Sequence, residues 1–200
     1  MDGFYLMKVS KCEFPHEVIK LNLCGRNIHE IINEDLKFFN NLIDLDLSEN
    51  YVNFDHITNL KELVVLSLQD NQIKEIPIQS SEFPVLQMLD ISYNQINHPS
   101  IKNLMNLENI QVLNLAGNYL EELPPNLEEF KKLEFLDLSS NEFRSSLKST
   151  ILWQSLASIG NLKHLNIARN YLRGIHTEKL SAGDFCKLEH LDFGYNSCEN

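Results

Sequence analysis

The chain has 200 residues, a hydrophobic content of 43% and a formal net charge of −11 at pH 7. This acidic surplus argues against a nucleic-acid-binding or anionic-membrane surface, because contacts with phosphates rely on lysine and arginine. No apolar run approaches the roughly 18 residues of a membrane span. The opening residues, MDGFYLMK, lack the basic region and the long apolar core of a signal peptide.

Cysteine usage indicates a reducing compartment. Cys12, Cys24, Cys186 and Cys198 are not clustered as in the disulfide-bonded caps of extracellular repeat proteins, and no N-x-[ST] acceptor occurs. We therefore expect a cytoplasmic protein with reduced thiols. The four cysteines are interpreted as small buried apolar side chains, with Cys198 in the place of a core leucine.

One pattern of apolar residues recurs along the whole chain. In residues 110–120 the apolar residues stand at relative positions 1, 4, 6 and 11, and an asparagine stands at position 9. The same spacing and asparagine recur in residues 42–52, 63–73, 86–96, 133–143 and 162–172. Weaker copies cover residues 188–198 and 18–28, where Arg26 replaces the asparagine.

The chemistry of one copy explains the pattern. The alternation Leu113-Asn114-Leu115 predicts a short strand whose leucines point into a core, while positions 3 and 5 point outward. At position 9 the chain turns away from the strand, and an amide side chain there satisfies unpaired backbone groups. We predict a structural ladder of the position-9 asparagines, namely Asn50, Asn71, Asn94, Asn118, Asn141, Asn170 and Asn196.

The spacing L-x-x-L-x-L-x-x-N-x-L resembles the signature of the leucine-rich-repeat family. The resemblance implies an α/β fold, a curved horseshoe-shaped solenoid of about eight repeats. A parallel sheet would line its concave side, and short helices, 3-10 turns and loops its convex side. One repeat cannot bury its own apolar edge, so the repeats must stack on one another.

Taken in chain order, residues 1–17 are expected to form an N-terminal cap. Residues 6–9 would cover the first repeat as an edge strand, and Phe4, Tyr5 and Phe14 would roof the open core. Residues 18–200 would form the solenoid. Because no residue after Asn200 would cover the last repeat, we expect the solenoid to continue beyond residue 200.

Helix-like spacing of apolar residues marks three connections, at residues 34–39, 100–104 and 126–130. The longest connection holds a fourth predicted helix near residues 149–157. Trp153 and Leu156 of that helix are expected to pack on the core.

No catalytic motif occurs among the P-loop, G-x-S-x-G, H-E-x-x-H and C-x-x-C patterns. His164 and His190 hold the same strand position in adjacent repeats, which places them about 5 Å apart. Two ligands alone seldom hold zinc, and solvated side chains are the favoured interpretation. We expect a protein that is not an enzyme and has no cofactor and no metal site.

The outward positions predict a binding surface. At position 3, four consecutive repeats carry apolar residues that the core does not need, next to a column of acidic and amide residues at position 5. Exposed apolar patches rimmed by polar groups often mark partner sites. The predicted protein-binding residues on the concave face are Val65, Met88, Val112, Phe135, Asp46, Asp90, Asp137, Tyr93 and His164. The alternative is that strand propensity alone accounts for Val and Phe.

Residues 8–130 also resemble the X-ray radiation resistance-associated protein family. The likeness runs through KCEFPHEVIKLNL (residues 11–23), LDLSEN (45–50) and LPPNL (123–127). This resemblance implies an intracellular, non-enzymatic protein with further sequence after residue 200, and a ciliary or cytoskeletal setting. A likeness to the leucine-rich regulatory subunit of protein phosphatase 1 is weaker, because the repeats here step by 21 to 29 residues.

We therefore predict a non-catalytic interaction or scaffold module of a larger intracellular assembly, in the cytoplasm and specifically a cilium, an axoneme or the cytoskeleton. Its partner would be a protein that presents a basic and apolar helix or extended segment, with neither nucleic acid nor membrane involved. One alternative is the substrate-recognition arm or regulatory subunit of an enzyme such as a ubiquitin ligase or a phosphatase. Another is an architectural protein that lies along a filament.

Overall fold

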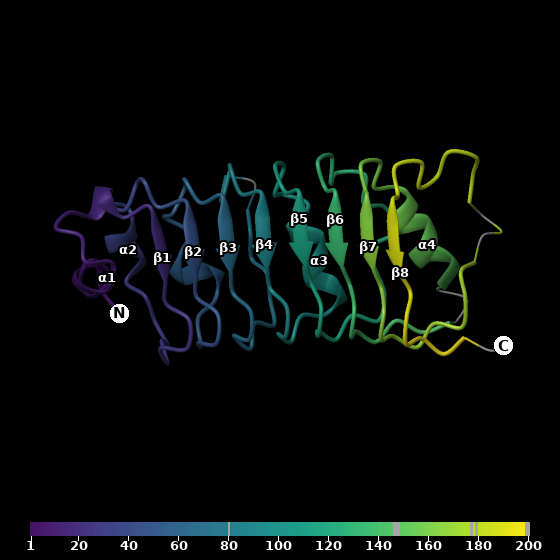
Figure 1. The fold of residues 1–200 in the computed structure, drawn as a ribbon, viewed down its shortest axis with the longest axis horizontal. Helices are drawn as coiled ribbons and strands as arrows, with labels where there is room; N and C mark the ends of the chain where they lie inside the picture. Colours follow the sequence, from purple (N-terminus) through teal and green to yellow (C-terminus); the bar gives the residue numbers. More distant parts are fainter. Residues whose placement is uncertain (80, 146–148, 177, 179, 199–200) are drawn as a thin grey trace.

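Eight strands form one parallel sheet whose spatial order is their order in the chain (Figure 1). The computed structural model describes residues 1–79, 81–145, 149–176, 178 and 180–198. Each strand has three residues, at positions 3 to 5 of its repeat. The strands are β1 (Lys20–Asn22), β2 (Asp44–Asp46), β3 (Val65–Ser67), β4 (Met88–Asp90), β5 (Val112–Asn114), β6 (Phe135–Asp137), β7 (His164–Asn166) and β8 (His190–Asp192).

The predicted alternation of the strand residues is confirmed. The central residue of β1 to β7 is a buried leucine, and these leucines form the core with the apolar residues at positions 1, 6 and 11. Only β8 departs from this pattern, because its Leu191 is 39% exposed at the end of the stack. Positions 3 and 5 lie outward in register, on the surface called the open face below, which corresponds to the expected concave sheet.

The connections between strands carry short helical segments on the side away from the open face (Figure 1). Three α-helices lie at or near predicted positions: α2 (Asn33–Leu36), α3 (His98–Leu104) and α4 (Ser149–Ala157). Single 3-10 turns span Pro15–Glu17 and Phe54–His56.

The predicted helix at residues 126–130 is wrong. Leu127 and Phe130 are buried as the spacing implied, but one turn achieves this, with the Phe130 N–H donating to the Leu127 carbonyl at 3.1 Å. Pro124 and Pro125 leave few residues for the connection, and nucleating a helix for so short a segment is unfavourable.

The N-terminal segment is a helix, α1 (Gly3–Ser10), and not the expected edge strand. Asp2 caps it by accepting a hydrogen bond from the Tyr5 N–H at 2.9 Å. Leu6 is its buried contact with the core. The expected roof of aromatic residues is also wrong, since Phe4 is 79% exposed and Phe14 is 54% exposed.

Helix α4 packs as the sequence predicted. Trp153 and Leu156 are buried, and the Trp153 ring lies 6.0 Å from the ring of Phe193, just after β8. The indole N–H of Trp153 is buried without a hydrogen-bond acceptor in the described part of the chain. The helix therefore leans towards the last repeat, where it shields part of the exposed end of the core (Figure 1).

The position-9 asparagines connect consecutive repeats through hydrogen bonds inside the turns. The Asn118 Nδ2 donates to the Leu115 carbonyl in its own repeat at 3.0 Å and to the Ile91 carbonyl in the preceding repeat at 3.1 Å. Its Oδ1 accepts from the Ile96 N–H of that preceding repeat at 3.0 Å. Equivalent bonds are made by Asn50, Asn71, Asn94, Asn141, Asn170 and Asn196.

Leu115→Ala tests the assignment of inward and outward residues. Leu115 is fully enclosed, so its truncation should lower the free energy of unfolding by about 2–5 kcal/mol. Val112→Ala in β5, the strand that ends directly before Leu115, removes a half-buried outward side chain and should cost below about 1 kcal/mol. Urea denaturation of both variants measures this difference; equal losses would contradict the assignment.

Asn118→Ala tests the ladder. The substitution leaves the buried Ile96 N–H without its acceptor, and it removes one of two asparagine donors from the Ile91 and Leu115 carbonyls, which keep Asn94 and Asn141. An unsatisfied buried group costs about 1–3 kcal/mol and a lost hydrogen bond about 1 kcal/mol, so we expect a loss of about 2–3 kcal/mol. Asn196→Ala is the matched control, because Asn196 makes the same bonds in the half-exposed last repeat, where water replaces them; its loss should be about 1 kcal/mol. A larger loss for Asn196→Ala in urea denaturation would show that burial does not set the strength of the ladder.

Candidate protein-binding surface

An apolar stripe crosses the middle of the open face. Val65, Met88, Val112 and Phe135 are paired in register on β3 to β6, so their side chains stand side by side. Met88 is 42% exposed and the other three are half-buried. We call these four residues the apolar stripe.

Two histidines extend the stripe towards the C-terminal end. The ring of His164 lies 6.1 Å from that of Phe135, and it stacks on the ring of His190 at 4.8 Å with an angle of 10° between the planes. The predicted adjacency of the two histidines is therefore confirmed. Within the residues that the structure describes, no group of three or more His, Cys, Asp or Glu side chains is arranged to hold a metal ion.

The aspartates beside the stripe have structural partners. Oδ1 of Asp46 accepts from the Ser48 N–H at 2.9 Å, and Oδ2 accepts from the Asn22 amide of the neighbouring strand at 2.8 Å. Asp90 and Asp137 repeat this arrangement, each with a backbone N–H two residues later and an asparagine on the next strand. The position-5 column is thus a second series of hydrogen bonds, and it fixes the orientation of each carboxylate.

Tyr93 lies in the turn after β4, at the margin of the open face. It adopts a left-handed backbone conformation with φ of 52°, and its exposed ring covers Gly117 of the next repeat. A Cβ atom on Gly117 would come within 2.6 Å of that ring, and Gly117 itself has a φ of 65°. The Tyr93 ring therefore favours glycine at position 117, whereas the positive φ alone is one that Tyr93 itself adopts at the same position of its repeat.

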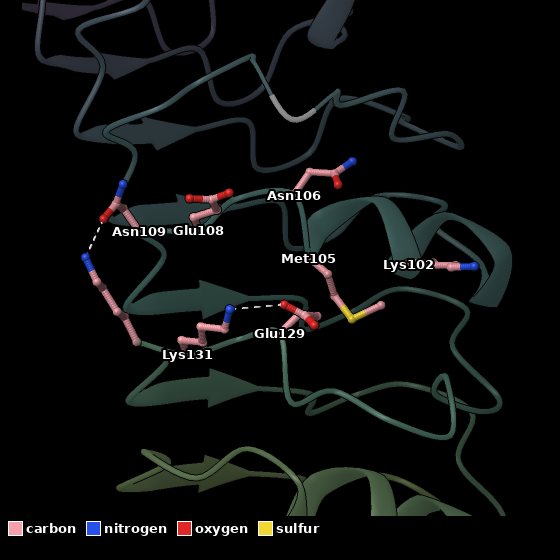
Figure 2. Close-up of a pocket in the computed structure, with 8 residues that line it drawn as sticks. Lys102, Met105, Asn106, Glu108, Asn109, Glu129 and Lys131 are labelled. Atoms are coloured by element: carbon pink, nitrogen blue, oxygen red, sulfur yellow. Dashed lines mark hydrogen bonds and ion pairs between the residues drawn. The ribbon is translucent and has the colours of Figure 1, made fainter.

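A cleft opens beside α3 at the edge where the strands begin (Figure 2). Its volume is about 500 Å³, and Lys102, Met105, Asn106, Glu108, Asn109, Glu129, Lys131 and Lys132 line it. Lys131 pairs with Glu129 at 3.5 Å, and Lys132 donates to Asn109 at 2.6 Å. These lining residues include no histidine, cysteine or serine that would act as base or nucleophile.

Sequence reasoning missed the asparagines that stand directly before several repeats. The side-chain amides of Asn41, Asn109 and Asn161 donate to the carbonyls of His16, Pro84 and Lys131 respectively, each of which stands two residues before the preceding repeat begins. They hold one common repeat position, so aligning the repeats from one residue earlier would have revealed them. These bonds connect consecutive segments at the edge where the strands begin, as the asparagine ladder connects the turns that follow the strands.

The interpretation of the cysteines as buried side chains is wrong. Cys12 and Cys24 are half-exposed, and Cys186 and Cys198 are exposed. Cys198 takes a core position of its repeat, but it lies at the uncovered end of the stack. Burial together with the carboxylates of Glu49 and Asp46 raises the pKa of the Cys24 thiol.

Alkylation rates test this environment. At mildly alkaline pH, iodoacetamide should modify Cys24 several-fold more slowly than Cys186, because a raised pKa lowers the thiolate fraction and the thiolate is the nucleophile. Mass spectrometry of peptides from the folded protein measures both rates, and the protein unfolded in guanidinium is the control in which they should converge. Equal rates in the folded protein would contradict the raised pKa.

Comparisons with known proteins agree with this geometry. A leucine-rich-repeat family model matches residues 84–143 and a second matches residues 132–156. Mouse X-ray radiation resistance-associated protein 1 is 28% identical over 101 residues, which cover 50% of this chain and 13% of that protein. Human leucine-rich repeats and immunoglobulin-like domains protein 3 is 32% identical over 104 residues, which cover 39% of this chain and 9% of that protein.

Solved structures share the fold. An internalin from Listeria monocytogenes superposes with a TM-score of 0.62 at 21% identity, covering 90% of this chain and 56% of that one. A leucine-rich-repeat protein of Leptospira interrogans gives a TM-score of 0.59 at 24% identity, covering 98% and 59%. No helix in the described ranges has the length and apolar character to cross a membrane. The repeats along the chain, the eight-stranded parallel sheet and the family models that match residues 84–156 together show a leucine-rich-repeat solenoid.

Proposed function

We propose that this chain is a non-catalytic protein-binding module whose open face holds a helix or extended segment of a partner along the apolar stripe. Leucine-rich-repeat proteins generally mediate protein–protein interaction, so the family supports the general function. The residues of the open face support the specific site.

The observation that carries the proposal is that the stripe is not needed for the core. The inward neighbours Leu66, Leu89, Leu113 and Leu136 fill the core on the same strands and are buried. The outward Val65, Met88, Val112 and Phe135 are consecutive in register and rimmed by polar residues, which is typical of partner sites. Each stripe residue lies on a strand that is paired with a strand on either side. A partner therefore gains contact area with little loss of conformational entropy in this chain.

The charges beside the stripe favour a basic partner segment. Asp46, Asp90 and Asp137 hold fixed orientations next to the stripe, and none of them forms an ion pair in the described ranges. A lysine or arginine beside the apolar residues of the partner would meet these carboxylates, and the net charge of −11 would speed its approach.

The same proposal places the module in a multi-protein intracellular assembly, with a ciliary or cytoskeletal one as the first choice. This setting is the one that the resemblance to the X-ray radiation resistance-associated protein family implies, and mouse X-ray radiation resistance-associated protein 1 matches half of this chain. The match spans 13% of the length of that protein, so membership in such an assembly belongs to the proposal.

The double variant Met88→Asp, Phe135→Asp tests the stripe. Two carboxylates on the stripe should lower the yield of a co-purified partner at least about tenfold, because the apolar contact is lost and a charge is desolvated. Cross-linking and co-purification from the native cell, followed by mass spectrometry, measures the yield. Circular dichroism verifies that the fold survives.

Phe38→Asp and Ile151→Asp are the matched controls. Both residues are exposed and apolar, and both lie outside the open face, in or next to helices α2 and α4. They should keep the partner. Retention of the partner by the stripe variant, with cross-links at residues 121–132 or 149–160, would favour an architectural role for the opposite side instead.

A further inference from the structure

Arginines and tyrosines gather on the turns that follow the last three strands. The chain has four arginines, and three of them, Arg144, Arg169 and Arg173, lie here with Tyr171 and Tyr195. We call these five residues the Arg–Tyr edge. Tyr171 is 54% exposed and Tyr195 is 80% exposed, so both rings are open to solvent in a chain that is acidic as a whole.

Backbone geometry brings the edge together. Residues 169–173 alternate between exposed and buried, so that Asn170 and Leu172 enter the core while Arg169, Tyr171 and Arg173 face outward. A parallel bridge places Arg144 of the preceding repeat beside Tyr171. The Arg169 N–H donates to the Gly194 carbonyl at 2.9 Å. This bond holds the turn after β8, which carries Tyr195, next to Arg169.

Each of two arginines stacks on a tyrosine of the next repeat. The Arg169 guanidinium carbon lies 4.6 Å from the centre of the Tyr195 ring, and that of Arg144 lies 5.2 Å from the centre of the Tyr171 ring. A guanidinium held over a ring keeps N–H groups at its edge for other partners, and two such N–H groups match the two oxygens of a carboxylate. Stacking therefore pre-orients both groups for bidentate binding.

A shallow cleft of about 510 Å³ lies among the segments that follow β6, β7 and β8. It is lined by Arg144, Ser145, Tyr171, Arg173 and Ser197. Arg173 has an interaction of its own within the chain, so recognition is assigned to Arg144 and Arg169. The internal competitor for Arg144 is Glu142, at 3.4 Å. The Arg144 side chain is 67% exposed and that of Glu142 is 37% exposed, and surface ion pairs of this kind are weak.

We propose that the Arg–Tyr edge is a second binding surface, which takes an acidic segment of a partner protein. Its carboxylates would bind the edges of the Arg144 and Arg169 guanidiniums, and its backbone and apolar atoms would pack on Tyr171 and Tyr195. Charge complementarity selects this occupant, because the edge concentrates positive charge on a chain of net charge −11. The same net charge repels the long phosphate backbone of a nucleic acid, whereas a short acidic peptide reaches only the edge.

Fluorescence anisotropy with a labelled oligoglutamate peptide tests the proposal, with an oligoglutamine peptide as the neutral probe. We expect oligoglutamate to bind with an affinity that falls as salt is added, and oligoglutamine not to bind. The double variant Arg144→Gln, Arg169→Gly should raise the Kd about tenfold or more. Glycine suits position 169 because φ there is 55°, so the variant should fold normally.

Arg26→Gln is the matched control, since it removes one positive charge at the opposite end of the molecule and should leave the Kd unchanged. Met88→Asp, Phe135→Asp should also keep oligoglutamate binding, which separates this surface from the apolar stripe. An unchanged Kd in the edge variant, or an equal loss in Arg26→Gln, would overturn the proposal. Tighter binding of oligothymidylate than of oligoglutamate to the same edge would overturn the choice of an acidic peptide.

Discussion

Amide side chains inside the turns are the interaction on which this solenoid depends. Each repeat must turn sharply after a strand of only three residues, and the turn leaves backbone N–H and carbonyl groups in the interior. The position-9 asparagine carries both a donor and an acceptor, so it satisfies groups of its own repeat and of the preceding one together. Arg26 occurs at this position in the first repeat, which has no strand-forming repeat before it.

In each repeat, one set of residues stabilises the fold and another set faces outward, where partners can bind. Core positions and ladder asparagines point inward in each repeat, so the outward positions are free to differ. The two candidate surfaces use this freedom differently: the apolar stripe follows the strands of repeats 3 to 6, and the Arg–Tyr edge follows the turns of repeats 6 to 8. A single chain thereby offers an apolar, acid-rimmed face and a basic, aromatic edge side by side.

The sequence predicts most of this fold because one repeat explains all the others. Strand positions, register and the adjacency of His164 and His190 follow from the period alone. The N-terminal helix does not, because residues before the first repeat have no repeat to copy, and capping by Asp2 decides their structure. The hydrogen bonds of Asp46 with the Asn22 amide and the Ser48 N–H were missed, because the spacing places these groups near one another but does not show which of them bond. The spacing shows which residues face outward, and hence the proposed stripe, but it does not show what covers them.

The placement of the two termini has a mechanical consequence. They lie at opposite ends of the stack, and the strands run across the long axis (Figure 1). Hydrogen bonds between parallel strands therefore point roughly along a line of tension applied through the termini, and they separate one strand pair at a time instead of shearing together. Since each repeat is held by its immediate neighbours, extension would release the chain in increments of one repeat. Such a molecule lengthens stepwise under load while its remaining repeats keep their surfaces intact.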